Sequence, residues 1–507
     1  MATFFNSPIP IPFFYCLLFS TLVFLHFLLL YSLSEYQHYI THPSHSLDYH
    51  HNIDDQNHSL NFNNTQISRS YSSRSDGFVS ITSKISNGAS TNGIASVSPT
   101  NYTDNFHVRQ RKQNKKSNLK ILEEGLARAR ATIMQATRIR VVNHSTTGEE
   151  DFKFVSRGSI YRNPNAFYQS HMEMEKRLKV WTYKEGELPL VHEGPVNNIY
   201  STEGQFIDEM ESGESQFSAH HPDQAHVFFL PFSVARLRRF VFKPEPSLPQ
   251  HHLNLFVTDY IRVISNRYPF WNRSAGADHF MVSCHDWGPN ISIGRPELFV
   301  NFIRVLCNAN TSEGFLPERD VSLPEVKLPF GQLTIPKLGA LPSKRTILAF
   351  FAGRVHGRIR KVLMKHWKDK DAEVQVYDYL PKSQSYAKKM AQSKFCLCPS
   401  GWEVASPRVV ESIFAGCVPV IISTSYVLPF SDVLDWSQFS VTISVQNIPM
   451  IKDLLKSISI SEYVKMHRRL KQVQRHFTIN RPSKRFDLIR MVLHSVWLRR
   501  LNVGLVS

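Results

Sequence analysis

The chain lacks several features that would point to simple classes of protein. Its six cysteines, among 507 residues, show neither the CxxC spacing nor the neighbouring histidines of a structural zinc site, so no metal is expected. Cys396 and Cys398 alternate as residues of a strand do, and we interpret them as core packing. Cys16 lies in an apolar segment, which leaves an odd number for the rest of the chain. At least one cysteine is therefore unpaired within the chain.

Two further absences concern the amino terminus. No charged residue occurs between Ile11 and Leu33, a run long enough to span a bilayer as a helix. No small-residue cleavage site follows, and the apolar core of a cleaved secretion signal is usually shorter. We therefore predict a transmembrane anchor over 11–33, after a cytosolic tail of residues 1–10. No Lys or Arg precedes the run, so the positive-inside rule does not fix its orientation.

The orientation is indicated instead by seven N-x-S/T triplets, the acceptor pattern for glycosylation in the secretory lumen. They begin at Asn57, Asn63, Asn101, Asn143, Asn272, Asn290 and Asn310. The triplets predict a large lumenal body behind a short cytosolic tail. In an oxidising lumen we expect a disulfide between Cys284 and Cys307.

Residues 34–118 have few apolar clusters and much Ser, Asn, His and Thr, which predicts a disordered lumenal stem. The segment 109–120 carries six basic side chains, and the whole chain has a formal net charge of +17. Such a segment can contact nucleic acid or an anionic polymer, or serve as a solvated linker. In a lumenal chain we favour the linker and expect no nucleic-acid partner. Leucines spaced by three or four then predict a stem helix in 119–150, which packs on the body or pairs with another chain.

The remaining chain alternates short apolar runs with helix-like stretches. The runs cover residues 178–183, 226–231, 278–283, 346–352, 374–377, 394–398, 418–423 and 439–443. This alternation predicts an α/β fold with parallel sheets. A Pro-rich stretch, 323–342, breaks both periods and marks a domain boundary. We predict two facing, doubly wound Rossmann-like domains, 151–335 and 336–460, with the ligand between them, and helices in 461–507 that pack back on the first domain.

Residues 395–423, FCLCPSGWEVASPRVVESIFAGCVPVIIS, contain the most informative pattern. An apolar strand enters a Pro-Ser-Gly turn, and a helix and a second apolar strand follow. The start of such a helix favours a phosphate group, so a nucleotide is the predicted ligand. Ser406 can cap this helix, and Glu411 lies one turn beyond Pro407 on the same face. Glu411 is predicted to accept the hydroxyls of a ribose, and the alternative is an ion pair with Arg408.

Two other segments end strands in polar loops. In FFAGRVHGRIR, Arg354 and Arg360 are placed to hold a diphosphate, with glycines that permit close approach of the backbone. In SCHDWGP, His285 and Asp286 could deprotonate an acceptor hydroxyl. Equally, Asp286 could cap the following turn while His285 packs, and both interpretations stay open.

One motif resembles a metal-binding pattern and is not assigned a metal. Asp369-Lys370-Asp371 has the D-x-D spacing with which some transferases hold manganese. It follows a predicted helix in a polar connection, so we interpret it as a solvated turn.

Many ordered blocks between about Leu122 and Val503 resemble the exostosin family, glycosyltransferase family 47, and its plant branch in particular. The blocks are EEGLARARA, EMEKRLKVWTYKEGELPLVHEGP, AHVFFLPFS, SCHDWGP, RVLCNANTSEGF, RDVSLPE, FFAGRVHGRIR, PSGWEVASPRVVESIFAGCVPVII and RHFTINRPSKRFDLIRMVLHSVWLRRLNV. The resemblance implies a type II Golgi membrane protein of two-domain GT-B architecture. It also implies transfer of a sugar from a nucleotide donor with inversion and without a bound metal ion, so that the UDP-sugar is a substrate and no cofactor is expected.

The family's donor-site pattern falls on Arg354, Arg360, Gly401, Ser406, Arg408 and Glu411. Glu403, eight residues before Glu411, has the E-x7-E spacing of several such enzymes, although a structural role is the favoured interpretation. Trp402 and Gly416 depart from the family pattern, and we expect both beside the donor loop.

Within the family, the blocks are most like those of xylogalacturonan xylosyltransferases. This likeness implies UDP-xylose as donor and a pectic galacturonan as acceptor, in the biogenesis of the cell wall. A basic body suits an acidic acceptor. The alternative is a non-catalytic partner or scaffold subunit of a glycosyltransferase complex, and either form could be a homo- or hetero-oligomer.

Overall fold

The computed structural model describes residues 102–138, 155, 160–241, 249–331, 333 and 339–505. The predicted cytosolic tail, the anchor over 11–33 and most of the stem lie outside these residues, as do Asn57, Asn63, Asn101 and Asn143. In the part of the chain that is described, no helix is both long and apolar enough to cross a membrane.

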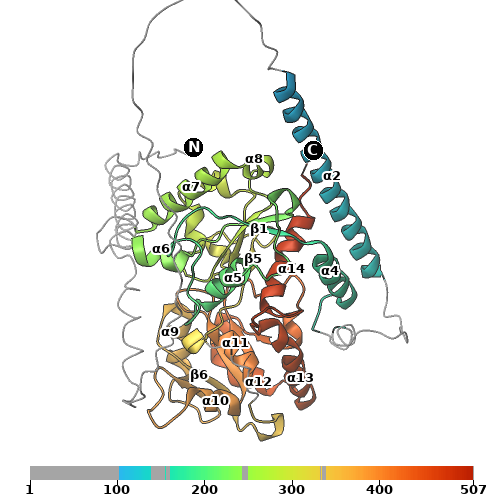
Figure 1. Ribbon diagram of the computed structural model, residues 1–507. Coiled ribbons are helices and arrows are strands. Elements are labelled where there is room, and N and C mark those ends of the chain that lie inside the picture. Colours follow the sequence, from blue (N-terminus) through green and yellow to red (C-terminus); the bar gives the residue numbers. More distant parts are fainter. Residues whose placement is uncertain are drawn as a thin grey trace, which may run out of the picture. The chain divides into compact units, whose positions relative to one another are not determined.

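The first domain contains a parallel sheet whose strands follow one another in chain order. Its strands are β1 (Val180–Thr182), β2 (Val227–Phe229), β3 (His279–Ser283), β4 (Ile303–Leu306) and β5 (Val321–Ser322). Its helices are α4 (Pro164–Arg177), α5 (Ser201–Glu211), α6 (Val234–Val241), α7 (Pro249–Arg267) and α8 (Phe270–Ser274) (Figure 1). Every residue of β2, β3 and β4 is buried, as expected for parallel strands that are covered on both faces.

The second domain contains a second parallel sheet, with the order β10-β9-β8-β6-β7. Its strands are β6 (Ile347–Ala352), β7 (Val374–Tyr377), β8 (Ser393–Pro399), β9 (Val418–Ile422) and β10 (Val441–Thr442). Its helices are α9 (Gly357–Trp367), α10 (Tyr386–Gln392), α11 (Pro407–Phe414), α12 (Ile451–Lys456) and α13 (Ile460–Phe477). The prediction of two domains with parallel sheets is confirmed, and the arrangement is consistent with a GT-B-like fold.

Strands β4 and β5 are absent from the predicted runs. Their sequences carry buried charge: Arg304 of β4 donates from Nε to Asp320 Oδ1 at 3.1 Å, just before β5. A buried ion pair is compatible with a core strand when its hydrogen bonds are satisfied. The charged residues interrupt the apolar runs from which strands are predicted, and this explains why both were missed.

Helix α2 (Tyr102–Arg138) begins earlier than the stem helix that we expected in 119–150. Its first part therefore belongs to the segment predicted to be disordered. Lys, Arg and Gln are abundant there and are good helix formers. Their polarity excludes a buried core but does not exclude a helix, and this is the physical reason for the difference.

Helix α14 (Leu488–Leu501) connects several parts of the fold (Figure 1). It packs on β4, β5, α4 and α2, and also on α13, which itself packs on α11 and β9. Arg500, 1% exposed, donates from Nε to His226 O at 2.8 Å and also pairs with Glu123 of α2. The buried guanidinium thus joins the last helix, the first sheet and α2.

Two disulfides hold strand ends together. The expected bond between Cys284 and Cys307 is present and joins the ends of β3 and β4. A second bond, between Cys396 of β8 and Cys417 before β9, was not predicted, because alternation along a strand indicated packing only. Cys398 is a buried free thiol.

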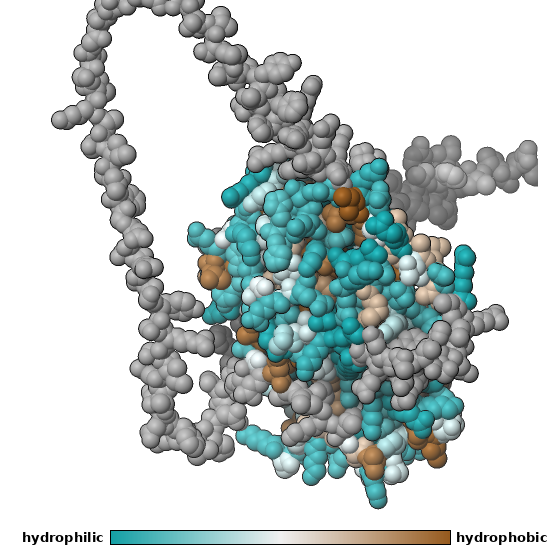
Figure 2. All heavy atoms as spheres, turned by 45° about the vertical axis from the view of Figure 1, so that its right-hand side comes forward, coloured by the Kyte–Doolittle hydropathy of each residue, from teal (hydrophilic) through white to brown (hydrophobic). Residues whose placement is uncertain are grey.

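The molecular face in Figure 2 is mainly hydrophilic, with exposed apolar residues in small, separate groups. Scattered apolar residues of this kind are ordinary on the surface of a folded domain. This face therefore presents no broad apolar area.

Replacement of Arg500 by Met should destabilise the fold by about 3–5 kcal/mol, because breaking a buried pair leaves uncompensated polar partners. Thermal unfolding of the full chain measures the effect as a lower midpoint. Arg468→Met is the matched control: its side chain is exposed, and a change within about 0.5 kcal/mol is expected. Equal midpoints for the two variants would contradict the role assigned to Arg500.

Candidate functional site

The second sheet has a switch point between β6 and β8. These strands are neighbours, but the chain leaves β6 toward β7 on one side and leaves β8 toward β9 on the other. Ligands of open parallel sheets bind at such a point, beyond the carboxyl ends of the strands. The loops that follow β6 and β8 are 353–356 and 400–406, the two segments in which the donor-site residues were predicted.

Glycines allow these two loops to touch. Gly357 has φ of 74°, and a Cβ built on it would lie 2.2 Å from the carbonyl oxygen of Gly401. A Cβ on Gly401 would in turn lie 3.1 Å from a terminal nitrogen of Arg360. Only glycine fits the first position without displacing the other loop. The sequence thus places Arg360 directly against the loop that begins α11.

Arg360 and Arg408, here called the arginine pair, are half-buried cations of α9 and α11. Arg360 Nε donates to the carbonyl oxygen of Pro399 at 3.3 Å, and the Arg408 guanidinium stacks on the Phe351 ring at 4.6 Å from its centroid. Among the described residues, no carboxylate lies within ion-pair distance of either guanidinium. Burial lowers the pKa of Arg360 to about 10, and repulsion from Arg408 adds to the effect. Two half-buried guanidinium groups that form no ion pair could bind an anion such as a diphosphate.

Helix α11 contributes to the same place. Ser406 caps it and accepts a hydrogen bond from the backbone N–H of Arg408 at 3.4 Å, and Pro407 occupies its first turn. Glu411 is half-buried and accepts a hydrogen bond from the Tyr386 hydroxyl at 3.1 Å. This hydroxyl is its partner, rather than the ion pair with Arg408 that was the alternative. Binding of a ribose by Glu411 stays a prediction.

Arg354 is held at the mouth of the loop after β6. Its guanidinium lies over the ring of Tyr379 at 5.4 Å, a cation–π contact that orients the side chain. His356 caps the start of α9, and burial, with repulsion from Arg360 and Arg354, lowers its pKa. Positive charge therefore dominates this edge of the second sheet.

The first sheet presents acidic residues at its own carboxyl edge. Asp286 follows β3, Asn308 follows β4 and Glu325 follows β5. Asp286 and Glu325, together with Glu313 and with Glu403 from the loop after β8, form what we call the acidic cluster. Its members are Asp286, Glu313, Glu325 and Glu403. The cluster therefore contains residues of both domains.

The carboxyl groups of the acidic cluster influence one another's pKa values. Burial raises the pKa of Asp286 to about 6, against the hydrogen bond from the Tyr200 hydroxyl and the charge of Arg238. Burial and repulsion from Asp286 and Glu313 raise the pKa of Glu403 to about 8. Burial raises the pKa of Glu325 well above its usual range, with further repulsion from Asp286 and Glu403. Perturbed carboxyl groups that are coupled in this way are typical of functional sites.

Asn308 joins the two domains within this cluster. Its amide nitrogen lies 2.7 Å from Glu403 Oε2, 2.9 Å from Glu313 Oε2 and 3.1 Å from the carbonyl oxygen of Asp286. Backbone bonds from Thr311 to Ser425 and from Val427 to Ala309, each 3.0 Å long, reinforce the junction. The contact places Glu403 in the acidic cluster, and the structural role favoured from the sequence stays a prediction.

The loop after β3 is rigidly supported. The carboxylate of Glu203 in α5 accepts hydrogen bonds from the backbone N–H of Cys284 at 2.9 Å and from Ser233. The disulfide between Cys284 and Cys307 fixes the same loop. His285 is buried, and its Nδ1 accepts from the backbone N–H of Trp287 at 3.1 Å. Of the two candidate bases, His285 is buried, whereas the carboxylate of Asp286 is half-buried. We therefore favour Asp286 as the base.

Three further residues were singled out from the sequence, and of these only Gly416 lies elsewhere than expected. Asp371 accepts from the backbone N–H groups of Glu373 and Val374 and pairs with Lys452 at 2.6 Å, so it shapes a turn. Gly416 lies beyond the end of α11, where a Cβ would press on Arg345, and not beside the donor loop. Trp402 is in the donor loop and is 64% exposed.

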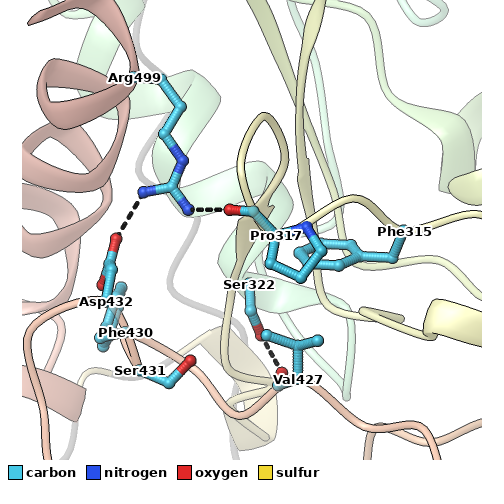
Figure 3. A pocket seen from close by; sticks show the side chains of 8 residues that line it. All are labelled: Phe315, Pro317, Ser322, Val427, Phe430, Ser431, Asp432 and Arg499. Atoms are coloured by element: carbon cyan, nitrogen blue, oxygen red, sulfur yellow. Dashed lines mark hydrogen bonds and ion pairs between the residues drawn. The ribbon is translucent and has the colours of Figure 1, made fainter. Parts of the chain in front are cut away.

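A separate cavity of about 170 Å³ is lined by Phe315, Pro317, Ser322, Val427, Phe430, Ser431, Asp432 and Arg499 (Figure 3). Arg499 points across it and donates to Asp432 Oδ2 at 2.7 Å and to the carbonyl oxygen of Pro317 at 3.0 Å. Its two charged groups therefore neutralise each other. None of the residues of the arginine pair or the acidic cluster lines this cavity, and we do not assign it to the chemistry.

Comparisons with known proteins show the family. The model of the exostosin GT47 domain matches residues 160–458, which include both sheets, the arginine pair and the acidic cluster. A probable glycosyltransferase of Arabidopsis thaliana is 50% identical over 403 residues, 80% of this chain and 76% of that protein. A probable glucuronoxylan glucuronosyltransferase of Arabidopsis thaliana is 28% identical over 352 residues, 64% of this chain and 77% of that protein.

Replacement of Arg360 by Ala should weaken the binding of uridine diphosphate at least tenfold, because each charge-assisted hydrogen bond contributes about 1.5–3 kcal/mol. Titration calorimetry of the full chain measures the dissociation constant. Lys361→Ala is the matched control, since this neighbouring cation is exposed, and its affinity should stay within twofold of wild type. Equal affinities for the two variants would remove Arg360 from the site.

Proposed function

The chain belongs to the exostosin GT47 family of glycosyltransferases, and on that premise we propose that it transfers a sugar with inversion from a UDP-sugar to a polysaccharide. The observation that carries the proposal is the half-buried arginine pair, which forms no ion pair, together with the acidic cluster. The arginine pair suits a diphosphate, which is negatively charged and gains charge when it leaves. The acidic cluster suits proton transfer from a hydroxyl.

The proposed reaction uses the two groups together. Asp286 accepts the proton of an acceptor hydroxyl, whose oxygen attacks the anomeric carbon. The bond from that carbon to the phosphate oxygen breaks, and UDP leaves with the electron pair. Arg360 and Arg408, with Arg354 from the neighbouring loop, stabilise the negative charge on UDP. Cationic side chains can perform this role without a metal ion, and we propose that the reaction needs none.

The donor sugar is proposed to be xylose and the acceptor a pectic galacturonan. The likeness of residues 399–420 and 494–503 to xylogalacturonan xylosyltransferases supports this choice. The net charge of +17 and the half-buried Arg238 beside Trp287, at 5.6 Å from the ring centroid, support an acidic acceptor.

We propose that the chain is a single-pass type II protein of the Golgi membrane with its catalytic body in the lumen. The apolar run over 11–33 supports an anchor, and the N-x-S/T triplets support the lumenal placement.

Asp286→Asn should lower turnover by about 10²–10⁴-fold, because it removes the general base. In the wild type, kcat/KM should rise with pH through about 6, since the base acts only when deprotonated and burial raises the pKa of Asp286 to about 6. The measurement is UDP release by the full chain with UDP-xylose and polygalacturonan oligomers, with and without EDTA. Asp378→Asn is the control, because its carboxylate pairs with Lys368 at the surface.

The outcomes separate the candidate functions. Loss of activity in Asp286→Asn alone, unchanged by EDTA, supports the proposed mechanism. Full activity of Asp286→Asn would assign the base elsewhere. UDP binding without any acceptor-dependent release, from any UDP-sugar, would favour the non-catalytic partner subunit.

The structure divides the N-x-S/T triplets of the folded body into accessible and inaccessible ones. Asn272 is exposed, whereas Asn310 is 5% exposed and its amide donates to Glu313 Oε1 at 2.9 Å. In a eukaryotic secretory host, Asn272→Gln should remove one glycan from the intact mass, and Asn310→Gln should leave the mass of the glycans unchanged. Absence of a glycan on Asn272 would count against lumenal placement of this surface.

A further inference from the structure

The loop after β7 brings a third segment to the predicted donor site. It covers residues 378–385 and leads into α10, whose first residue is Tyr386. Because β7 runs parallel to β6, this loop lies at the same carboxyl edge of the sheet as the loop after β6. The ring of Tyr379 lies under Arg354 at 5.4 Å, and the hydroxyl of Tyr386 donates to Glu411 Oε2 at 3.1 Å. Two tyrosines of this part of the chain thus contact residues of the donor site.

Tyr386 is held in place by its surroundings. Residues 381–385 before it are exposed, whereas Tyr386 is half-buried. Its ring packs on the buried Phe350 of β6, with 5.7 Å between the ring centroids. Ser385 caps α10 and accepts a hydrogen bond from the backbone N–H of Lys388 at 3.3 Å. Burial raises the pKa of the Tyr386 hydroxyl, so this group keeps its proton and remains a donor at neutral pH.

The hydrogen bond acts on the residue that is predicted to hold the ribose. Glu411 has several rotatable bonds, and a side chain of this kind loses rotamer freedom when it binds a ligand. A bond that already fixes the carboxylate reduces this loss. The bond to Oε2 leaves Oε1 able to accept from hydroxyl groups. Arg408 precedes Glu411 by three residues, about 5 Å along the helix axis, so one nucleotide can reach both.

We propose that Tyr386 is a positioning residue of the donor site, whose hydroxyl holds the Glu411 carboxylate in the orientation that accepts the 2′- and 3′-hydroxyl groups of the nucleotide. The inference rests on the proposed function and assigns a residue to recognition of the ribose. Tyr386 acts through Glu411 and needs no contact with the ligand. Its removal should therefore weaken recognition of the ribose and leave binding of the diphosphate unchanged.

The test compares UDP with 2′,3′-dideoxy-UDP, which lacks both hydroxyl groups of the ribose. Dissociation constants are measured by titration calorimetry on the full chain. In the wild type, the dideoxy compound should bind at least about tenfold more weakly, because hydrogen bonds to a charged group are lost. In Tyr386→Phe this ratio should fall about threefold or more, since Glu411 must then be ordered on binding. The affinity for 2′,3′-dideoxy-UDP should equal that of wild type.

Tyr377→Phe is the matched control. The ring of Tyr377 also packs beside Phe350, at 6.5 Å between centroids, but its hydroxyl donates to Gln375 Oε1 at 3.4 Å. Loss of this hydroxyl should leave the wild-type ratio unchanged. Glu411→Ala tests the route of the effect. It should lower the ratio at least as far as Tyr386→Phe does, and adding Tyr386→Phe to it should change the ratio no further.

The outcomes separate the inference from the proposed function. If neither UDP nor any UDP-sugar binds to the folded chain, the proposed function fails. If UDP binds but Tyr386→Phe or Glu411→Ala keeps the wild-type ratio, or the wild type does not distinguish the two nucleotides, the inference fails while the proposed function stands. Equal weakening of both nucleotides in Tyr386→Phe would also overturn it, because Tyr386 would then support only the fold. Should a melting curve show that Glu411→Ala does not fold, the comparison of Tyr386→Phe with Tyr377→Phe decides alone.

Discussion

The site depends on one constraint, the parallel direction of the strands in both sheets. Parallel strands end at a common edge, so the loops after β3, β4 and β5 bring Asp286, Asn308 and Glu325 together from residues far apart in the chain. The loops after β6 and β8 do the same for Arg360 and Arg408. The 2.7 Å contact between Asn308 and Glu403 then joins one edge to the other. An antiparallel connection at any of these strands would move its loop to the far side of the sheet.

Local sequence patterns were sufficient for the second domain. Most of its strands are apolar runs, and the predicted donor-site residues lie in the loops after β6 and β8 or in the first two turns of the helices that follow. A glycine in a polar loop indicates a place where two segments approach closely, and Gly357 and Gly401 do so. The positions of Arg360 and Arg408 in the fold could therefore be predicted from the sequence, although their contacts could not, because the partners come from other elements.

The first domain was harder to predict for a physical reason. The buried pair of Arg304 and Asp320 interrupts the apolar pattern, so β4 and β5 were missed, and with them the positions of Asn308 and Glu325. The acidic cluster combines residues from separate loops of two domains, and no local pattern links them. The disulfide between Cys396 and Cys417 was missed for the same reason, since it depends on the pairing of β8 with β9. By contrast, the strand run before Asp286 was clear, and that residue was identified.

The arginine pair and the acidic cluster are coupled electrostatically. Arg360 lowers the pKa of Glu325, and Glu325 in turn raises that of Arg360. An anion bound to Arg360 would screen this favourable interaction, so the ionised form of Glu325 would become less stable, and a proton would bind more readily there. By thermodynamic reciprocity, a protonated Glu325 favours the bound anion. Under the proposed function, the arginine pair would bind a diphosphate most readily when Glu325 is neutral. The half-buried Asp286, whose pKa is raised only to about 6, can remain ionised in the same state, and this separation of pKa values lets one site bind an anion and still contain a base.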